Sequence, residues 1–294
     1  MSRIFSEMSV GGLAALACQL ECAAPKVGNV HRAADFEDVT LYDFLISGQI
    51  VGNAIDRLKR QPVGVTVLAC VEETVRVARS NTNLGMVLLL VPLAKAIDRL
   101  EPGAELGPNA VSEVLQSLDS DDSQKIYAAI RAANPGGMNS VEHHDVRGPA
   151  PASLLTAMQD AADRDLIARQ FVNQFREVFA SAGRLQANQG RFGSLAVSIV
   201  VTHLELIAEH GDSLIARKCG IEISDHARVL AQRALAKGIV DGWLGMLDAV
   251  ADLDFWMRSD GHRRNPGSTA DIIAAALLVA LFNDWISLKF ALGN

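Results

Sequence analysis

Long apolar segments with helical spacing, each ended by a short polar segment, dominate this chain. In residues 9–23 the apolar side chains recur three or four positions apart, which places them on one side of an α-helix. Pro25 and Gly28 then end that helix. Segments with the alternating pattern of a half-buried strand are nearly absent. The sequence therefore predicts an all-α fold.

The same pattern predicts a series of helices along the chain. They span residues 9–23, 41–58, 65–78, 86–100, 110–118, 123–133, 153–183, 193–210, 224–249 and 270–290. We expect one multi-helix bundle over residues 1–294, with an active site formed by polar segments between the helices. No strand precedes a GxGxxG or GxxxxGK[ST] loop and no repeat of fixed period is present, so we expect neither a Rossmann domain, a P-loop nor a solenoid.

The composition favours closely packed helices. Hydrophobic residues make up 49% of the chain and aromatic residues only 5%, so the interior is filled by Ala, Leu, Val and Ile. The longest apolar runs, Met86–Ala94 and Ile272–Phe282, are shorter than the roughly 20 residues that a membrane-spanning helix needs. We therefore expect buried helices and no membrane partner.

The charge and the cysteines exclude several classes of protein. A formal net charge of −7 provides no global positive field for a nucleic-acid backbone. Four cysteines without a CxxC pair do not form a disulfide scaffold. The apolar N-terminal stretch lies between Glu7 and Glu21 and has only Arg3 as a basic residue, which does not fit a signal peptide. We expect a cytoplasmic protein that binds no nucleic acid, and the sequence indicates no particular oligomeric state.

The first polar segment with chemically useful groups begins at Ala24. Lysine and arginine attract phosphate oxygens, glycine lets backbone N–H groups approach a ligand, and carboxylates further along hold divalent cations. An ordinary solvated loop is an equally simple interpretation of this segment taken alone. The candidate binding residues are Lys26, Gly28, Asn29, His31 and Arg32.

A second polar segment directly precedes the apolar run at Met86. Asn81, Thr82 and Asn83 can hydrogen-bond to a substrate, or they can cap the following helix. Both interpretations are compatible, because the N-terminus of a helix also binds anions.

A long loop over residues 134–151 contains the pair His143 and His144 beside Asp145. Loops of this length are usually functional or disordered. Adjacent side chains diverge, and neither an HExxH motif nor a second His/Cys cluster is present, so the pattern does not favour zinc.

Two further polar segments lie in the second half of the chain. In Glu209–Gly220, an acidic group at Asp212 is followed by Arg217 and Lys218, so one short segment can bind a metal and a polyphosphate. A solvated interhelical turn is the alternative. In Arg263–Asp271, two arginines precede an apolar helix, and Ser268 can cap that helix or contact phosphate.

Taken in order, these segments resemble the triphosphoribosyl-dephospho-CoA synthase family, whose other name is ATP:dephospho-CoA triphosphoribosyltransferase. The resemblance spans nearly the whole chain and rests on four motifs. These are Pro25–Gly28, Asn81–Thr82, Asp212–Gly220 and Pro266–Asp271.

The resemblance is closer to the diverged branch found in archaea and in one-carbon-metabolising bacteria. That branch shows the forms Gly-Asn-Val-His, Asn-Thr-Asn-Leu-Gly and Asp-Ser-Leu-Ile-Ala-Arg-Lys, all of which are present here. The better-known branch has a His-Lys pair after Asn-Thr, where this chain has Asn83 and Leu84. The missing lysine points to an acceptor other than dephospho-CoA.

The family resemblance implies an enzyme that uses ATP and Mg²⁺, in which an acceptor hydroxyl attacks C1′ of the ATP ribose and adenine leaves. It implies metal binding or electrostatic stabilisation by Asp212 and Asp271, because positive charge develops at C1′. The same resemblance assigns phosphate to Lys26, Arg217 and Lys218. It assigns substrate orientation to Asn29, His31, Asn81, Thr82 and Asn83.

The predicted partners are a nucleotide and a coenzyme precursor, and the predicted role is in coenzyme biosynthesis. For this branch the acceptor is expected among intermediates related to tetrahydromethanopterin or methanofuran. Two alternatives stay open: a nucleotide-binding protein of the same fold without transfer activity, and an ATP-dependent kinase or ligase.

Overall fold

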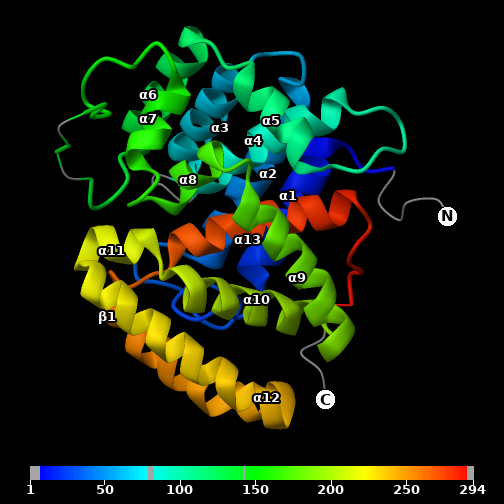
Figure 1. Cartoon of the computed structure of the whole chain (residues 1–294), viewed down its shortest axis with the longest axis vertical. Coiled ribbons are helices and arrows are strands. Elements are labelled where there is room, and N and C mark those ends of the chain that lie inside the picture. Colours follow the sequence, from blue (N-terminus) through cyan, green and yellow to red (C-terminus); the bar gives the residue numbers. More distant parts are fainter. Residues whose placement is uncertain (1–6, 79–82, 139, 142, 290–294) are drawn as a thin grey trace.

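The computed structural model describes residues 7–78, 83–138, 140–141 and 143–289. Over these residues the chain forms thirteen helices, one four-residue strand and no sheet, so the all-α prediction is confirmed (Figure 1). The elements are α1 (Val10–Ala23), α2 (Leu41–Arg57), α3 (Val63–Ala78), α4 (Leu84–Arg99), α5 (Pro108–Gln116), α6 (Ser120–Ala133), α7 (Leu154–Ala161), α8 (Leu166–Val172), α9 (Arg176–Phe192), α10 (Leu195–His210), α11 (Ser213–Cys219), α12 (Ile221–Arg258), β1 (Ser259–His262) and α13 (Gly267–Phe282).

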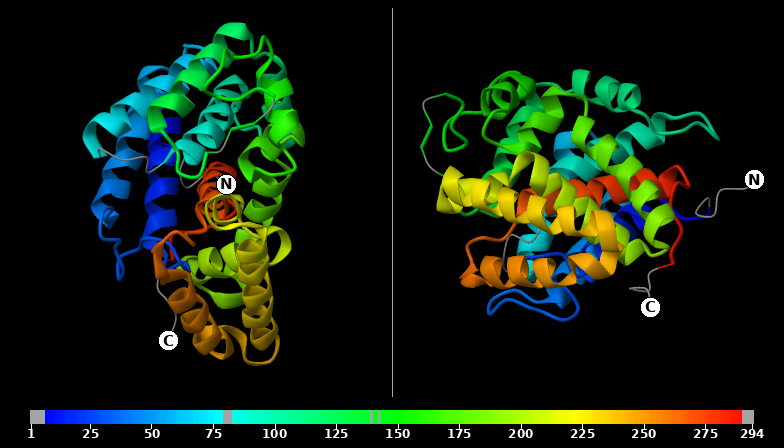
Figure 2. Two further views of the ribbon diagram at one scale, coloured as in Figure 1. Left: turned by 90° about the vertical axis from the view of Figure 1, so that its left-hand side faces the viewer. Right: turned by 60° about the horizontal axis from the view of Figure 1, so that its bottom comes forward.

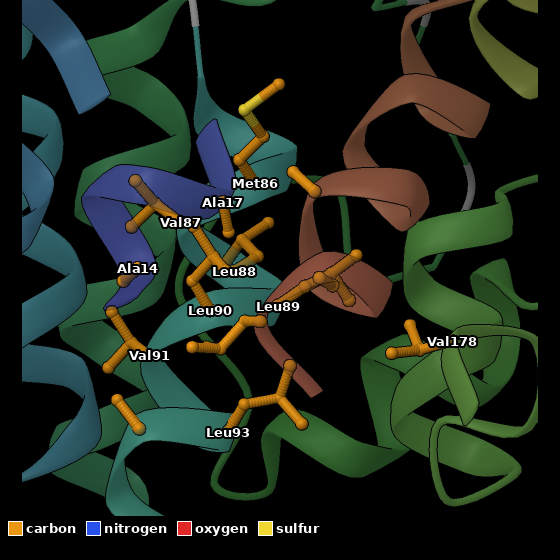
Figure 3. Close-up of a cluster of buried hydrophobic side chains, with 14 of the residues drawn as sticks. Ala14, Ala17, Met86, Val87, Leu88, Leu89, Leu90, Val91, Leu93 and Val178 are labelled. Carbon is orange, nitrogen blue, oxygen red and sulfur yellow. The ribbon is translucent and has the colours of Figure 1, made fainter. Parts of the chain in front are cut away.

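Two largely buried helices, α4 and α13, pack against each other in the interior. Every residue from Ile272 to Leu281 is buried, and so are all residues from Met86 to Ile97. Figure 3 shows the side chains of α4 beside Ala14 and Ala17 of α1, whose small size lets the helices approach closely. The prediction of two buried helices is thus confirmed, and their first turns are held in fixed positions by the core.

The helix α10 packs against α9 on one side and against α12 on another (Figure 2). Ala227 and Ala231 of α12 are buried together with Leu204 and Ile207 of α10. Within α12 the chain changes direction at Gly242, whose φ of 63° lies in the left-handed region that favours glycine. The element therefore consists of two helical halves.

The helix predicted over residues 153–183 is wrong, because three helices occupy this part of the chain. Asp165 caps α8 by accepting hydrogen bonds from the backbone N–H groups of Ile167 and Ala168. Gln174 and Phe175 both have φ of 60°, which interrupts the helix before α9. Neither residue is one that ordinarily indicates a left-handed break.

Two other predicted helices have different bounds. The segment predicted over 224–249 starts earlier and extends to Arg258, and it is preceded by the separate short helix α11. The helix predicted to end at residue 290 ends at Phe282, shortly before Asp284 adopts φ of 56°. The predicted loop after Ala133 is confirmed over its described residues, because no helix begins before Leu154.

In the described part of the chain, no helix has the length and apolarity required to cross a membrane. One apolar cluster contains buried side chains from each of the helices α1 to α10 and from α13. The organisation of residues 1–294 as one domain stays a prediction.

Candidate active site

A cavity of about 740 Å³ lies where the first turns of α4, α11 and α13 come together. The end of α1, the loop after α6 and the helix α8 complete its lining. Each of the polar segments singled out from the sequence contributes at least one residue. The cavity thus joins segments that are far apart in the chain, and its size is typical of a site for a small molecule.

Asp212 connects two of these segments through its carboxylate. As the N-cap of α11 it accepts hydrogen bonds at Oδ1 from the backbone N–H groups of Leu214 (2.8 Å) and Ile215 (3.1 Å). Its Oδ2 accepts hydrogen bonds from the backbone N–H and the hydroxyl of Thr269, at 2.8 and 2.9 Å. Burial raises the pKa of Asp212, and these hydrogen bonds oppose the shift. The carboxylate therefore fixes the start of α11 against the start of α13.

His203, a histidine that the sequence analysis did not single out, supports the contact between Asp212 and Thr269. The side chain of His203 on α10 is fully buried, and its Nε2 lies 3.0 Å from the Thr269 hydroxyl. Desolvation lowers the pKa of His203 to about 3. The neutral imidazole can donate from Nε2 to Thr269, which in turn donates to Asp212. His203 thus holds the hydroxyl in its place.

Asp271 lines the cavity from the first turn of α13 and lies against the first turn of α4. A Cβ atom on Gly85 would lie only 1.9 Å from Asp271 Oδ2, so the absence of a side chain at Gly85 admits the carboxylate. Burial raises the pKa of Asp271 well above its usual value, and the nearby charge of Glu21 raises it further; a backbone hydrogen bond from Met86 opposes both. The carboxylate thus occupies a helix N-terminus, where negative charge is stabilised.

Most of the predicted residues in the first polar segment serve packing. Lys26 is fully buried and its Nζ lies 2.8 Å from Glu21 Oε1. Gly28 has φ of 68° and donates its N–H to Asp254 Oδ1, at 2.7 Å. Burial lowers the pKa of His31 to about 4, and Arg32 is exposed. None of Lys26, Gly28, His31 and Arg32 lines the cavity.

Asn29 is the exception in this segment, because its side chain lines the cavity. Its Nδ2 donates to Asn265 Oδ1 at 2.8 Å, whereas its buried Oδ1 has no hydrogen-bond partner among the described residues. Asn83 also lines the cavity, where it donates from Nδ2 to the Thr74 hydroxyl and does not cap α4 with its side chain. Two carboxamides thus contribute to the lining.

Cationic groups reach the cavity from α11 and from the residues around α8. Arg217 is already engaged, since it pairs with Asp165 at 3.1 Å and donates to the carbonyl of Gly136. Lys218 makes no ion pair within the described residues, and burial together with Arg217 lowers its pKa. Arg164 and Arg169 also line the cavity. Of the predicted phosphate ligands, Lys218 is the one whose ammonium has no protein anion as a partner.

The loop after α6 covers one side of the cavity and is held by neighbouring helices. The Tyr127 hydroxyl donates to the carbonyl of His144 at 3.0 Å, and His144 Nδ1 lies 2.7 Å from Asp160 Oδ2. Across the described residues, no group of three or more His, Cys, Asp or Glu side chains is arranged to hold a metal ion. The paired histidines therefore serve the loop and its lining of the cavity.

The structure brings together seven of the predicted site residues and places four others, Lys26, Gly28, His31 and Arg32, outside the cavity lining. Those that line the cavity are Asn29, Asn83, Asp212, Arg217, Lys218, Ser268 and Asp271. Asn81 and Thr82 lie outside the described residues. Sequence reasoning missed Glu21, Asp165 and Asn265, all of which line the cavity. For Glu21 a signal was present, because it is an acidic residue beside Cys22 on the apolar side of a helix.

Comparisons with known proteins identify the family. The family model for ATP:dephospho-CoA triphosphoribosyl transferase, CitG, matches residues 7–290. The fold is similar to the crystal structure of a protein from Archaeoglobus fulgidus that carries the name triphosphoribosyl-dephospho-CoA synthase, with a TM-score of 0.62 and 24% sequence identity. That match covers 83% of this chain and 99% of the other. A comparison with curated proteins found no match. Since the family model covers nearly the whole chain, this protein belongs to the ATP:dephospho-CoA triphosphoribosyl transferase family and is a transferase of that type.

Proposed function

We propose that this protein transfers the triphosphoribosyl group of ATP to a hydroxyl of a coenzyme precursor and releases adenine. The observation that carries the proposal is the position of Asp271, a carboxylate at the first turn of two packed helices and on the surface of a large cavity. Lys218 on the same cavity makes no ion pair with any described residue, so its ammonium can bind the triphosphate.

The reaction forms a bond between the acceptor oxygen and C1′ of the ribose and breaks the bond between C1′ and adenine. Adenine leaves with the electron pair of that bond and takes up one proton, and the acceptor gives up its hydroxyl proton, so that protons balance over the reaction. Positive charge develops at C1′ in the transition state, so carboxylates held in fixed directions near the ribose stabilise it. Asn29 and Asn83 line the cavity, where they can orient a ribose or an acceptor by hydrogen bonds.

The residues fit Mg²⁺ at Asp271 and not at Asp212. Mg²⁺ usually binds through one or two carboxylates together with substrate phosphates and water. Asp271 faces the cavity, whereas each oxygen of Asp212 already accepts two hydrogen bonds. When bound, Mg²⁺ would neutralise the triphosphate. We therefore assign a metal-binding role to Asp271 and a positioning role to Asp212.

For the acceptor we propose an intermediate related to tetrahydromethanopterin or methanofuran. The support is the motif resemblance to the one-carbon branch, including the absence of the His-Lys pair at Asn83 and Leu84. The cavity is also lined by apolar side chains that suit a large organic acceptor, among them Met86, Tyr127 and Met158.

The direct test is incubation of the purified protein with ATP, Mg²⁺ and single acceptors, with the products separated by chromatography. We expect free adenine with one acceptor of the one-carbon group and less with dephospho-CoA. Asp271→Asn should abolish adenine release, while Asp248→Asn on the exposed surface of α12 is the matched control. Formation of ADP or AMP would instead indicate a kinase or a ligase, and ATP binding without turnover would indicate a binding protein.

A further inference from the structure

Glu21 is a buried acidic residue that lines the cavity and that the packing of the helices does not require. It lies in the last turn of α1, and its side chain is only 4% exposed. Its Oε1 pairs with Lys26, and Glu21 lines the cavity. Burying a carboxylate costs free energy even when it is paired. A positively charged centre in the cavity would offset that cost.

Lys26 holds Glu21 in a single direction. The ammonium lies 2.8 Å from Glu21 Oε1 and donates to the backbone carbonyl of Glu21 at 2.5 Å. The chain turns back immediately after α1, where the Lys26 N–H donates to the carbonyl of Ala24. The ammonium is therefore fixed against Glu21, and the backbone of the lysine is fixed against Ala24.

Stability does not account for this pair. A buried ion pair is often no better for stability than apolar side chains of similar volume, because both charges lose their hydration. The surroundings here are apolar, since Ala17, Cys18 and Cys22 are buried on the same helix. A pair that is kept in such a place, with one member at the cavity surface, is better explained by chemistry in the cavity.

Glu21 also acts on the same space as Asp271. The helices α1 and α13 pack against each other, and both carboxyl groups line the cavity. The charge of Glu21 contributes to the raised pKa of Asp271. Burial also raises the pKa of Glu21, which Lys26 opposes. A positively charged centre in this part of the cavity would stabilise the ionised forms of both carboxyl groups.

We infer that Glu21 is a catalytic carboxylate that contacts the ribose and stabilises the positive charge at C1′, and that Lys26 is a positioning residue that directs Glu21. This inference rests on the proposed transfer reaction. Glu21 takes no proton and forms no bond in it, so the balance of atoms is that of the transfer itself. Lys26, which sequence reasoning assigned to phosphate, acts through Glu21 and does not touch the nucleotide.

The test compares Glu21→Gln, Lys26→Met and the double variant in the adenine-release assay. Glu21→Gln should lower kcat by about 10²-fold and leave KM for ATP nearly unchanged, because the charge acts mainly in the transition state. Lys26→Met should lower kcat as well. In the double variant it should add no further loss, because its effect passes through Glu21.

Glu177→Gln is the matched control, since Glu177 is a buried glutamate that is hydrogen-bonded by Gln170 and Asn173 and does not line the cavity. It should leave kcat unchanged. Denaturant unfolding gives a readout apart from activity: Lys26→Met should be the least stable variant, and adding Glu21→Gln to it should restore stability, because the unpaired buried charge disappears. That neutral double variant also serves if a single variant does not fold.

Normal kcat in Glu21→Gln, with an active wild type, would overturn the role of Glu21 and leave the proposed function standing. If the two single losses of kcat multiply in the double variant, the positioning role of Lys26 is overturned. An inactive wild type with every acceptor would overturn the proposed function, and the inference would fall with it.

Discussion

The contact between Gly85 and Asp271 provides a substitution with a sharply defined outcome. Gly85 is the second residue of α4, and a Cβ atom there would lie 1.9 Å from Asp271 Oδ2 and 2.6 Å from its Cγ. In Gly85→Ala the carboxylate must therefore move by about 1 Å or more, and it loses the hydrogen bond from the Met86 N–H. Misplacement of a catalytic group by about 1 Å can cost about 10²-fold in rate.

The effect on stability should not exceed the effect on activity, because a loss of about 10²-fold in rate corresponds to about 2.7 kcal/mol. Loss of a buried hydrogen bond costs about 1–3 kcal/mol, and alanine in a helix returns about 0.5–1 kcal/mol relative to glycine. The net change is a destabilisation of about 0–2.5 kcal/mol. For a chain of 294 residues that corresponds to a fall in Tm of roughly 0–4 °C.

Gly183→Ala is the matched control, because Gly183 lies exposed within α9 and a Cβ atom there meets nothing within 4 Å. It should raise Tm by about 1–2 °C and leave adenine release unchanged. Thermal unfolding followed by circular dichroism and the adenine-release assay together check both variants. If Gly85→Ala retains full activity, or gains stability as Gly183→Ala does, the placement of Asp271 at the cavity is refuted.

Three further substitutions test the support of the site. Desolvation lowers the pKa of His203 from 6.5 to about 3, so between these pH values the unfolded chain binds a proton that the folded chain does not. The free energy of unfolding should therefore decrease as the pH is lowered through this window. Measured in urea, its slope should be steeper than that of His203→Gln by about 1.4 kcal/mol per pH unit. Thr269→Val removes the hydroxyl that contacts His203 and leaves Asp212 Oδ2 with only the backbone N–H of residue 269, and denaturant unfolding should show a loss of about 1–3 kcal/mol. Gly28→Ala places a Cβ atom 2.7 Å from Met257 Sδ at a φ of 68°, so the yield of folded protein and its Tm should both decrease.

The sequence pattern predicts the helical core well because burial acts on whole segments. The uniformly apolar runs in α4 and α13 could be recognised without knowing their neighbours. The breaks around α8 were missed, since Gln174 and Phe175 adopt left-handed φ values without a glycine to indicate them. The tertiary contacts that support those conformations cannot be predicted from the local sequence.

The site could be predicted by segment and not by side chain. Motif order indicated which loops converge, and each of them reaches the cavity. Whether a side chain faces the cavity depends on the rotation of its helix and on its ion-pair partner. Lys26 illustrates this, because a lysine beside glycine suggests phosphate, yet a glutamate five residues earlier binds its ammonium.

The four hydrogen bonds of Asp212 have a consequence for how chains of this family can vary in length. Asp212 and Thr269 are 57 positions apart, and their contact brings the two ends of the intervening segment together. The intervening segment, which contains α12, thus begins and ends at the junction of Asp212 and Thr269. The first turn of α12 belongs to this junction, because Ser224 hydrogen-bonds to the backbone of Asp212. Insertions or deletions around Gly242 would leave that junction intact. The far part of α12 is therefore a natural position for grafting a new segment, or for shortening the chain, without displacing the catalytic groups.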